Sequence, residues 1–311
     1  MDKSARKLKE HYGIEVPMSA IRVMTLKHGE AMREGRDLGI ENKLPDGGIG
    51  MALAQTDGSM VPIVTIKPLE NDESPRDGRK RRSLSWQEGR LVLTRDIGKV
   101  TPRYAATMGT VEQTTELLVD SLVKIGAGKS TRVHGMGDGA VWIANRTMDK
   151  LKGQATFLLD FYHISEYIAA AAEVVAAGRK QGWLREQQQH LKDNQVSKLL
   201  NELERHCQFH DLAKCGRHHE RNEREECPAH RCKRYIENRL DYLDYKGALE
   251  AGLPIGTGET EGGHRSIIQA RIKKSGAWWL RESVDKILAL RTNRANQEWE
   301  PYWANFRQRA A

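Results

Sequence analysis

Apolar residues that recur with a helical period mark several segments of the chain as helices. Residues 110–125 show the 3.6-residue apolar period of an amphipathic helix. Residues 3–12 and 18–33 are expected to form two short helices with the outline of a helix-turn-helix, and the alternative is a plain helical arm. Residues 163–245 are strongly polar and helical in pattern, which indicates an all-helical insertion.

Strand-like segments lie between these helices. Residues 50–64 have a β-like pattern, with a turn expected at residues 57–59, where Asp-Gly-Ser occurs. Residues 88–94 and 155–159 are expected strands, and a further short strand is expected to end at Asp138. The order of strands, helix and strands predicts an α/β fold with a mixed sheet flanked by helices.

The same pattern divides the chain into segments. Residues 1–34 form the N-terminal helical segment, and a linker rich in Gly, Asp, Asn and Pro follows. Residues 50–162 are expected to form the first part of the core, and residues 163–250 the helical insertion with its cysteines and histidines. Residues 251–300 are then expected to complete the core.

Composition narrows the class of protein. Of the 311 residues, 39% are hydrophobic and 30% are charged, which is typical of a soluble globular protein. The chain has no apolar run long enough for a transmembrane helix, and its charged N-terminus does not resemble a secretory signal, so a cytoplasmic protein is expected. The formal net charge is +8, and basic residues cluster at 76–83 and 265–274. This clustering favours a polyanion such as nucleic acid, whereas scattered charge would only aid solubility.

Three acidic residues lie in contexts that suit a metal-dependent phosphoryl-transfer site. Asp57 and Asp138 each follow a strand-like stretch and precede glycine, and Glu261 opens a basic helical segment. Carboxylate oxygens are the ligands that two Mg²⁺ or Mn²⁺ ions require, and two such ions about 3.5–4 Å apart activate the attacking oxygen and stabilise the leaving oxygen. The alternative for either aspartate taken singly is that Asp-Gly marks a turn.

Glu259 competes with Glu261 for the role of the third ligand. Two residues apart on a helix, their side chains point to nearly opposite faces, so both cannot enter one site. Glu261 is expected to share a face with Arg265 and Ile268. Four basic residues that follow are candidate phosphate contacts, and the alternative is a solvated basic helix: Arg265, Arg271, Lys273 and Lys274.

Asp160 and His163 lie at the junction between the expected strand at 155–159 and the next helix. Asp160 is expected to cap that helix, because aspartate commonly accepts the unpaired N–H groups of the first turn. His163 has three interpretations from the residues: a packed core histidine, a phosphate contact, or a residue that orients the metal site.

The four cysteines, with several histidines around them, fall within the expected insertion: Cys207, Cys215, Cys227 and Cys232. Thiolates and imidazoles suit a tetrahedral Zn²⁺, but the spacings differ from the two-residue pairs of common zinc modules. A structural zinc site and a set of free thiols therefore both remain open.

Four motifs, in order, resemble those of a known family. They are TDGSMVPI, GDGAVWI, LLDFYHISEYI and GTGETEG followed by ARIKKSGAWW. Together they resemble the DDE transposases of bacterial insertion sequences of the ISKra type, which are similar to Mutator-like transposases. The resemblance covers roughly residues 1–305, although family members usually have more sequence before the segment that starts here.

The resemblance implies a core, a site and partners. The core would be RNase H-like, with the helical insertion before the final glutamate. Asp57, Asp138 and Glu261 would bind two Mg²⁺ or Mn²⁺ ions, with Asp160 and His163 as an accessory pair. The partners would be double-stranded DNA at transposon ends and at the target, acted on by a homo-oligomer at the nucleoid. The alternatives are an RNase H-like nuclease without strand transfer and a truncated or domesticated DNA-binding remnant without catalysis.

Overall fold

In the computed structural model, the chain forms two compact units. Unit 1 comprises Met1–Thr131 and Glu259–Ala311, and unit 2 comprises Arg132–Gly258. The described residues are 2–67, 81–139, 144, 147, 149–151, 153–209 and 227–310. The cluster of basic residues before position 81 and Cys215 therefore lie outside the described residues.

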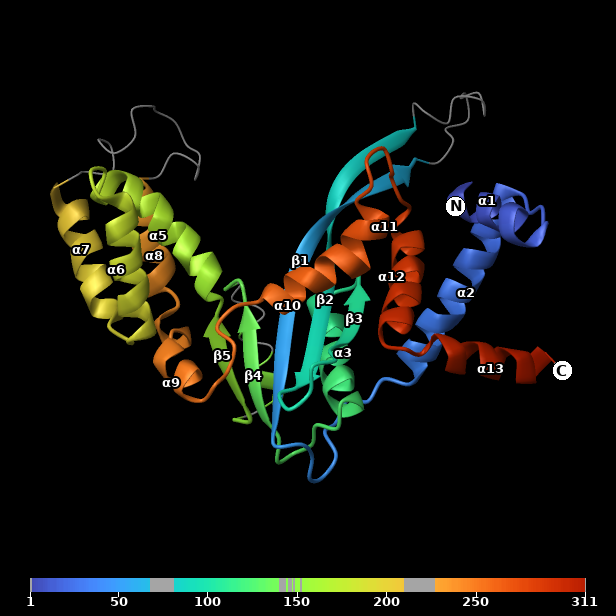
Figure 1. The fold of residues 1–311 in the computed structure, drawn as a ribbon, viewed down its shortest axis with the longest axis horizontal. Coiled ribbons are helices and arrows are strands. Elements are labelled where there is room, and N and C mark those ends of the chain that lie inside the picture. Colours follow the sequence, from blue (N-terminus) through green and yellow to red (C-terminus); the bar gives the residue numbers. More distant parts are fainter. Residues whose placement is uncertain are drawn as a thin grey trace. The chain divides into compact units, whose positions relative to one another are not determined.

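Three antiparallel strands form the sheet of unit 1 (Figure 1). Strand β1 (Met51–Ile66) pairs with β2 (Arg82–Asp96), and β2 pairs with β3 (Arg103–Thr107). Residues 52–56 at the start of β1 are buried, as are residues 91–93 of β2. The two expected strands at 50–64 and 88–94 are confirmed, whereas β3 was not expected.

The expected turn at residues 57–59 is wrong. Asp57 pairs with Leu91, and Gly58 pairs with Arg90, within an uninterrupted β1–β2 ladder. The glycine has a packing role instead, because a Cβ atom at position 58 would collide with the Glu88 side chain. Long-range strand pairing has here outweighed the local turn preference of Asp-Gly.

Helices of unit 1 pack on this sheet and on one another. They are α1 (Asp2–Tyr12), α2 (Met18–Leu38), α3 (Val111–Lys124), α12 (Arg281–Ala295) and α13 (Trp299–Ala310). Thr110 and Gln113 form a reciprocal capping box at the start of α3, which is why this helix begins where the sequence predicts. Helix α2 runs past the expected end at residue 33 to Leu38, because Arg33 pairs with Glu30 and Asp37 along its surface.

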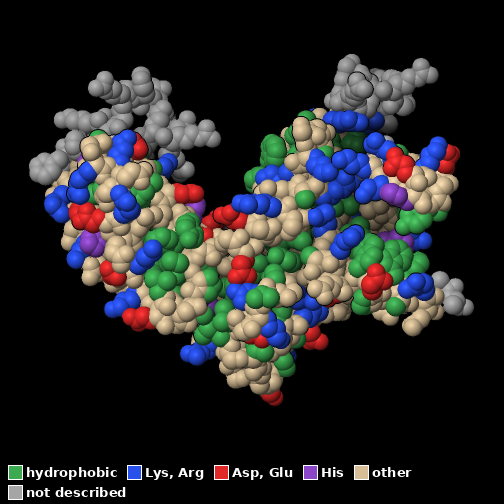
Figure 2. Space-filling model, viewed as in Figure 1, with side chains coloured by type: hydrophobic (Ala, Val, Ile, Leu, Met, Phe, Trp, Pro, Cys, Tyr) green, Lys and Arg blue, Asp and Glu red, His purple; other side chains and the backbone are tan. Residues whose placement is uncertain are grey.

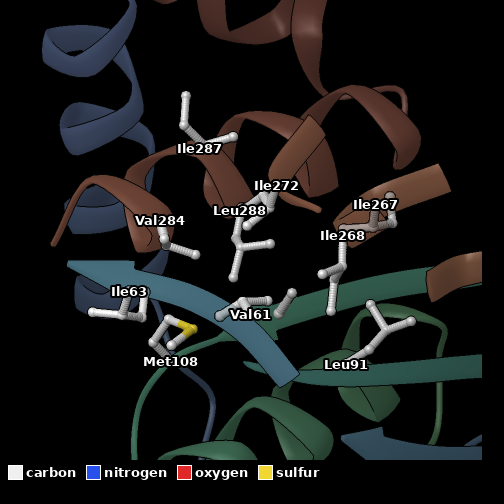
Figure 3. Close-up of a cluster of buried hydrophobic side chains, with 11 residues drawn as sticks. Val61, Ile63, Leu91, Met108, Ile267, Ile268, Ile272, Val284, Ile287 and Leu288 are labelled. Carbon is white, nitrogen blue, oxygen red and sulfur yellow. The ribbon is translucent and has the colours of Figure 1, made fainter. Parts of the chain in front are cut away.

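The core of unit 1 joins the sheet to the C-terminal part of the chain (Figure 3). Residues 258–272 form three consecutive helical pieces: α10 (Gly258–Gly263), the π-helix η3 (His264–Gln269) and α11 (Ala270–Ile272). Ile267, Ile268 and Ile272 are buried against Val61 and Leu91 of the strands. The apolar side chains of this basic segment therefore fix it onto the sheet.

Unit 2 combines a parallel strand pair with helices. Strand β4 (Arg132–Gly137) pairs with β5 (Ala155–Leu159), and both strands are almost fully buried. The helical elements that follow are α5 (Phe161–Val175), α6 (Lys180–Lys192), α7 (Val196–Phe209), α8 (Pro228–Glu237), η2 (Leu240–Tyr242) and α9 (Tyr245–Glu250). Trp183 and Tyr245 are among its largest buried side chains. Over its described residues, segment 163–245 is helical, as expected.

The chain is thus an α/β protein with antiparallel and parallel strand pairs and flanking helices. The expected α/β class with mixed strands is confirmed at this level. No helix within the described ranges has the length and the apolar character that crossing a membrane requires.

Candidate active site

Asp57 of β1 faces a histidine that the sequence reading did not select. Its Oδ2 lies 3.1 Å from His264 Nε2, and its Oδ1 accepts a hydrogen bond of 2.7 Å from the Gly58 N–H. The Asp57 side chain is 32% exposed, whereas the imidazole is 5% exposed. The carboxylate therefore borders solvent on one side and a buried ring on the other.

The buried ring of His264 is not satisfied by the protein. Among the described residues, neither ring nitrogen has a hydrogen-bond partner of acceptable geometry, although Nε2 is close to Asp57. Buried polar atoms are nearly always paired, and each exception calls for an explanation, such as a bound ligand, ion or water. The surroundings of Asp57 and His264 are therefore a candidate site.

Local geometry explains how His264 reaches the strand. It opens the π-helix η3, and such wide turns are frequent at functional sites. Gly263 precedes it and lies so close to the sheet that a Cβ atom would collide with Leu91 and Tyr104. Glycine at 263 thus permits the close approach that brings His264 to Asp57.

Glu259 and Glu261 have different surroundings, although they are two residues apart on α10. Both carboxylate oxygens of Glu259 accept hydrogen bonds from Arg95, at 2.9 and 2.7 Å. Glu261 is 62% exposed and contacts Arg265 at 3.2 Å. The intervening Thr260 is buried and donates its hydroxyl to Gln55. Glu259 therefore holds the helix to the sheet, and Glu261 keeps a solvent-facing carboxylate.

The expected face shared by Glu261, Arg265 and Ile268 is only partly present. Arg265 does contact Glu261, but Ile268 is fully buried in the core of unit 1. The π-helix accounts for the difference, because its wider turn changes the direction of every side chain that follows.

Asp138 of unit 2 follows directly after β4, and helix α8 fixes its backbone. Its carbonyl oxygen accepts a 2.8 Å hydrogen bond from the Tyr235 hydroxyl. The next carbonyl, of Gly139, accepts a 2.9 Å bond from Arg239 Nε. Gly139 has φ of 84°, a conformation that other residues rarely adopt. The short segment after β4 is therefore held in place, with the Asp138 side chain half-buried.

Asp160 caps helix α5, as its position after β5 predicted. Its Oδ1 accepts hydrogen bonds from the N–H groups of Tyr162 and His163, at 2.6 and 3.1 Å. Its Oδ2 accepts from the Thr257 N–H at 2.8 Å and from the Thr257 hydroxyl. Both oxygens of Asp160 therefore bind groups of unit 2 itself.

His163 lies in an aromatic cluster that also contacts the Asp138 backbone. Its ring centroid lies 5.5 Å from that of Tyr167 and 5.8 Å from that of Tyr235, and these two tyrosines are stacked at 3.9 Å. Burial raises the pKa of Tyr235, so its hydroxyl stays protonated and donates to Asp138. Tyr235 thus links two of the candidate site residues, Asp138 and His163.

The three candidate metal ligands and the accessory pair Asp160 and His163 are divided between the two units. Asp57 and Glu261 belong to unit 1, and Asp138, Asp160 and His163 belong to unit 2. Within the part of the chain that the structure describes, no three His, Cys, Asp or Glu side chains are gathered as a metal site. By their chemistry, the solvent-facing carboxylates of Asp57 and Glu261 fit hard divalent cations, which prefer oxygen ligands.

Three of the four candidate zinc ligands are described. Cys207 lies on α7, and Cys227 and Cys232 lie at the start of and within α8, both buried. Cys232 is fully buried, and this burial raises its pKa to about 12. Because Cys215 lies outside the described residues, the zinc site remains a prediction.

The four candidate DNA contacts lie on or beside η3 and α11, where Figure 2 shows Lys and Arg side chains gathered near α11 and α12. Arg265, Lys273 and Lys274 are exposed. Lys273 Nζ lies 3.2 Å from Ser59 Oγ on β1. Arg271 is half-buried over the Trp279 ring, at 5.5 Å. These cations therefore follow the segment that carries Glu261.

The functional residues that sequence reasoning missed are those whose role depends on distant contacts. His264 follows Glu261 by three residues and lies just after the quoted GTGETEG motif, a signal that could have suggested it. Tyr235 and Thr257 carry no local signal, because their hydrogen-bond partners, Asp138 and Asp160, are distant in the sequence.

No protein-family model matches this chain, and no curated protein matches it.

Proposed function

We propose that this protein cuts and joins DNA strands as a DDE transposase of the ISKra type, built on an RNase H-like core. The observation that carries the proposal is the pairing of Asp57 with buried, unsatisfied His264, three residues after the solvent-facing Glu261. It supports a phosphoryl-transfer site because two carboxylates are available beside a basic segment. The antiparallel β1–β2–β3 strands and the parallel β4–β5 pair are compatible with such a core.

Asp57, Asp138 and Glu261 would hold two Mg²⁺ or Mn²⁺ ions. Bound there, the ions would lower the pKa of water or of a DNA 3′-hydroxyl and would stabilise the departing 3′-oxygen. The remaining tasks fall to the chain itself. Arg265, Lys273 and Lys274 would bind phosphates of the duplex and set its position, since phosphate contacts orient DNA without reading its bases.

His264 and Asp160 would act on the position of the acidic groups. His264 borders Asp57 and restricts the orientation of its carboxylate. Asp160 joins the start of α5 to Thr257, the residue just before Gly258 at the start of α10. In this proposal Asp160 is a positioning residue, because its own oxygens are occupied.

A DNA cleavage assay with the full chain tests the proposal. Supercoiled plasmid and duplex oligonucleotides are incubated with Mg²⁺ or Mn²⁺, and nicked or cut products are measured. We expect metal-dependent cleavage that Glu261→Gln abolishes. Glu259→Gln is the matched control, because it makes the same change two residues away on the same helix. It should retain cleavage to within about tenfold and lose about 1 kcal/mol of stability, because Glu259 is 37% exposed and Arg95 still donates to nearby backbone carbonyls.

Full activity of Glu261→Gln together with loss in Glu259→Gln would reverse the assignment of the third ligand. Joining of a cut 3′ end to a target duplex distinguishes the transposase from a nuclease that only hydrolyses. A chain that binds DNA but never nicks it with either metal would be a DNA-binding remnant. Inverted repeats that bracket the gene would favour the transposase independently.

A further inference from the structure

A groove in unit 1, separate from the acidic residues, has the composition of a site for unpaired nucleotides. It has a volume of about 810 Å³ and lies between α2, the far end of the β1–β2 ribbon and the segment at 277–283. Its lining includes Arg22, Arg82 and Arg271 together with Trp278 and Leu84. No Asp or Glu lines it among the described residues.

Backbone and side-chain hydrogen bonds anchor Trp279, the residue next to Trp278. The neighbouring Trp279 pairs with β1, with its N–H 3.2 Å from the Pro62 carbonyl oxygen and its own carbonyl accepting from Val64 N–H at 2.8 Å. Trp279 also donates its indole N–H to the carbonyl of Ile272, at 3.0 Å. Trp278, the residue before this anchor, is 39% exposed and lines the groove together with Trp279.

Trp278 meets a second exposed tryptophan on the ribbon. Trp86 of β2 stands opposite Pro62, and its ring centroid lies 6.0 Å from that of Trp278 at an interplanar angle of 60°. Trp86 is 56% exposed and Trp278 is 39% exposed. Two large indoles are thus held at the surface by the ribbon and by the Trp279 anchor. Neither indole ring belongs to the buried hydrophobic cluster of unit 1.

The positive charges of the groove are not balanced by acidic neighbours. In the described part of the chain, Arg22, Arg82 and Arg271 form no ion pair with a carboxylate. Close by, burial and then the charges of Arg271 and Arg294 lower the pKa of Arg291. Such a concentration of guanidinium groups favours an anionic ligand.

Arginines and exposed indoles together select one class of ligand. Nucleobases stack on aromatic rings, and their phosphates bind arginine, whereas the base faces of an intact duplex are already stacked. We propose that this groove binds an unpaired stretch of a DNA strand, with a base against Trp278 and its phosphates at Arg82 and Arg271. The inference rests on the proposed action on DNA and adds a site for strands that are no longer paired.

Binding of oligonucleotides without metal ions tests this site apart from catalysis. Affinity for fluorescently labelled oligo-dT and for a duplex of equal length is measured by anisotropy for the full chain, Trp278→Leu and Trp278→Phe. Trp278→Leu should weaken oligo-dT binding between about 5-fold and 150-fold, which is the range for loss of one stacked base. Trp278→Phe keeps an aromatic face and should lose less than Trp278→Leu. Duplex affinity should change less than twofold in both variants.

Two further variants complete the test. Arg82→Ala should weaken oligo-dT binding and reduce its salt dependence, whereas Arg185→Ala on exposed α6 is the matched control and should do neither. Equal losses for oligo-dT and duplex in Trp278→Leu, or equal losses in the Leu and Phe variants, would overturn base stacking. Unchanged oligo-dT affinity in Trp278→Leu would overturn the site as a whole. Stacking at Trp278 without any metal-dependent cleavage would overturn the proposed catalysis and leave this site standing.

Discussion

Asp57 lies within strand β1 and Asp160 directly after strand β5, and their carboxylates have opposite surroundings. Asp160 accepts four hydrogen bonds from its own unit, two to each oxygen. Asp57 accepts one such bond and otherwise faces a buried imidazole and solvent. A carboxylate whose oxygens are all bound by its own fold stabilises that fold. A carboxylate with an oxygen atom that the fold does not bind, next to another unsatisfied polar group, can bind a ligand.

Neutralising the carboxylates of the proposed metal site should have the largest effect. Asp57→Asn and Asp138→Asn each keep the side-chain shape and remove a ligand charge. Metal-dependent DNA cleavage should fall by at least about 10³-fold in each variant, because loss of metal binding removes several kcal/mol of transition-state stabilisation. DNA affinity without metal should be unchanged or slightly higher, since a repulsive charge has been removed. Substantial cleavage by Asp57→Asn would contradict its role as a ligand.

Asp160 should show the reverse pattern, with its largest effect on stability. Asp160→Ala removes the α5 cap and the partner of Thr257, and should lower the free energy of unfolding by about 2–4 kcal/mol in urea denaturation. Asp244→Ala is the matched control, because Asp244 caps the exposed start of α9 in the same unit. It should cost only about 1 kcal/mol. An Asp160→Ala protein of normal stability that lost cleavage would instead make Asp160 a direct participant.

The basic segment beside Glu261 permits a smaller, quantitative test. Replacement of Lys273 and Lys274 by alanine removes two expected phosphate contacts. The slope of log affinity for duplex DNA against log salt should flatten by about 1.8, at about 0.9 for each contact. All sequences should weaken about equally, because phosphate contacts carry no base information. The double variant of exposed Lys198 and Lys246 in unit 2 should leave the slope unchanged.

The smallest expected effect is on how the free energy of unfolding of unit 2 depends on pH. His134 of β4 is buried with Nε2 2.9 Å from the Pro254 carbonyl oxygen, and burial lowers its pKa, although that bond partly opposes the shift. Below about pH 6.5 the unfolded chain takes up a proton that the folded chain does not. The free energy of unfolding should therefore fall with decreasing pH, by at most about 1.4 kcal/mol per pH unit.

His134→Gln checks this interpretation, because glutamine still donates to Pro254 but does not titrate. Its unfolding free energy should depend less on pH between 7 and 5 than that of the parent chain. Identical pH profiles for the two proteins would show that His134 does not titrate differently on folding.

Local signals made much of the fold predictable. Helix α3 has both an apolar period and a capping box within its own sequence, and β5 is a short apolar strand. Strand β3 was missed because its five residues are defined by pairing with β2 and carry little pattern of their own. The Asp57-Gly58 turn was mispredicted for the same reason, since β2 lies more than twenty residues away in the sequence.

The candidate site was predictable only in part. Helix geometry separated Glu259 from Glu261, and the structure gives them different partners. The local sequence could not show that Arg95 forms an ion pair with Glu259 or that His264 lies next to Asp57. The partners of both contacts are more than a hundred residues apart in the sequence. Asp160 was correctly expected to cap a helix, since a cap depends on the next few residues alone.

Helix α2 has a consequence for any shortened form of this protein. Gly29 of α2 lies so close to α12 that a Cβ atom would collide with the Lys286 carbonyl, and Met32 is buried nearby. Val23 and Met24, toward the other end of the helix, are exposed. A deletion that removes residues 1–38 would therefore strip a covering layer from α12. Whether this helix contacts DNA is better tested by point changes at its exposed face than by trimming the chain.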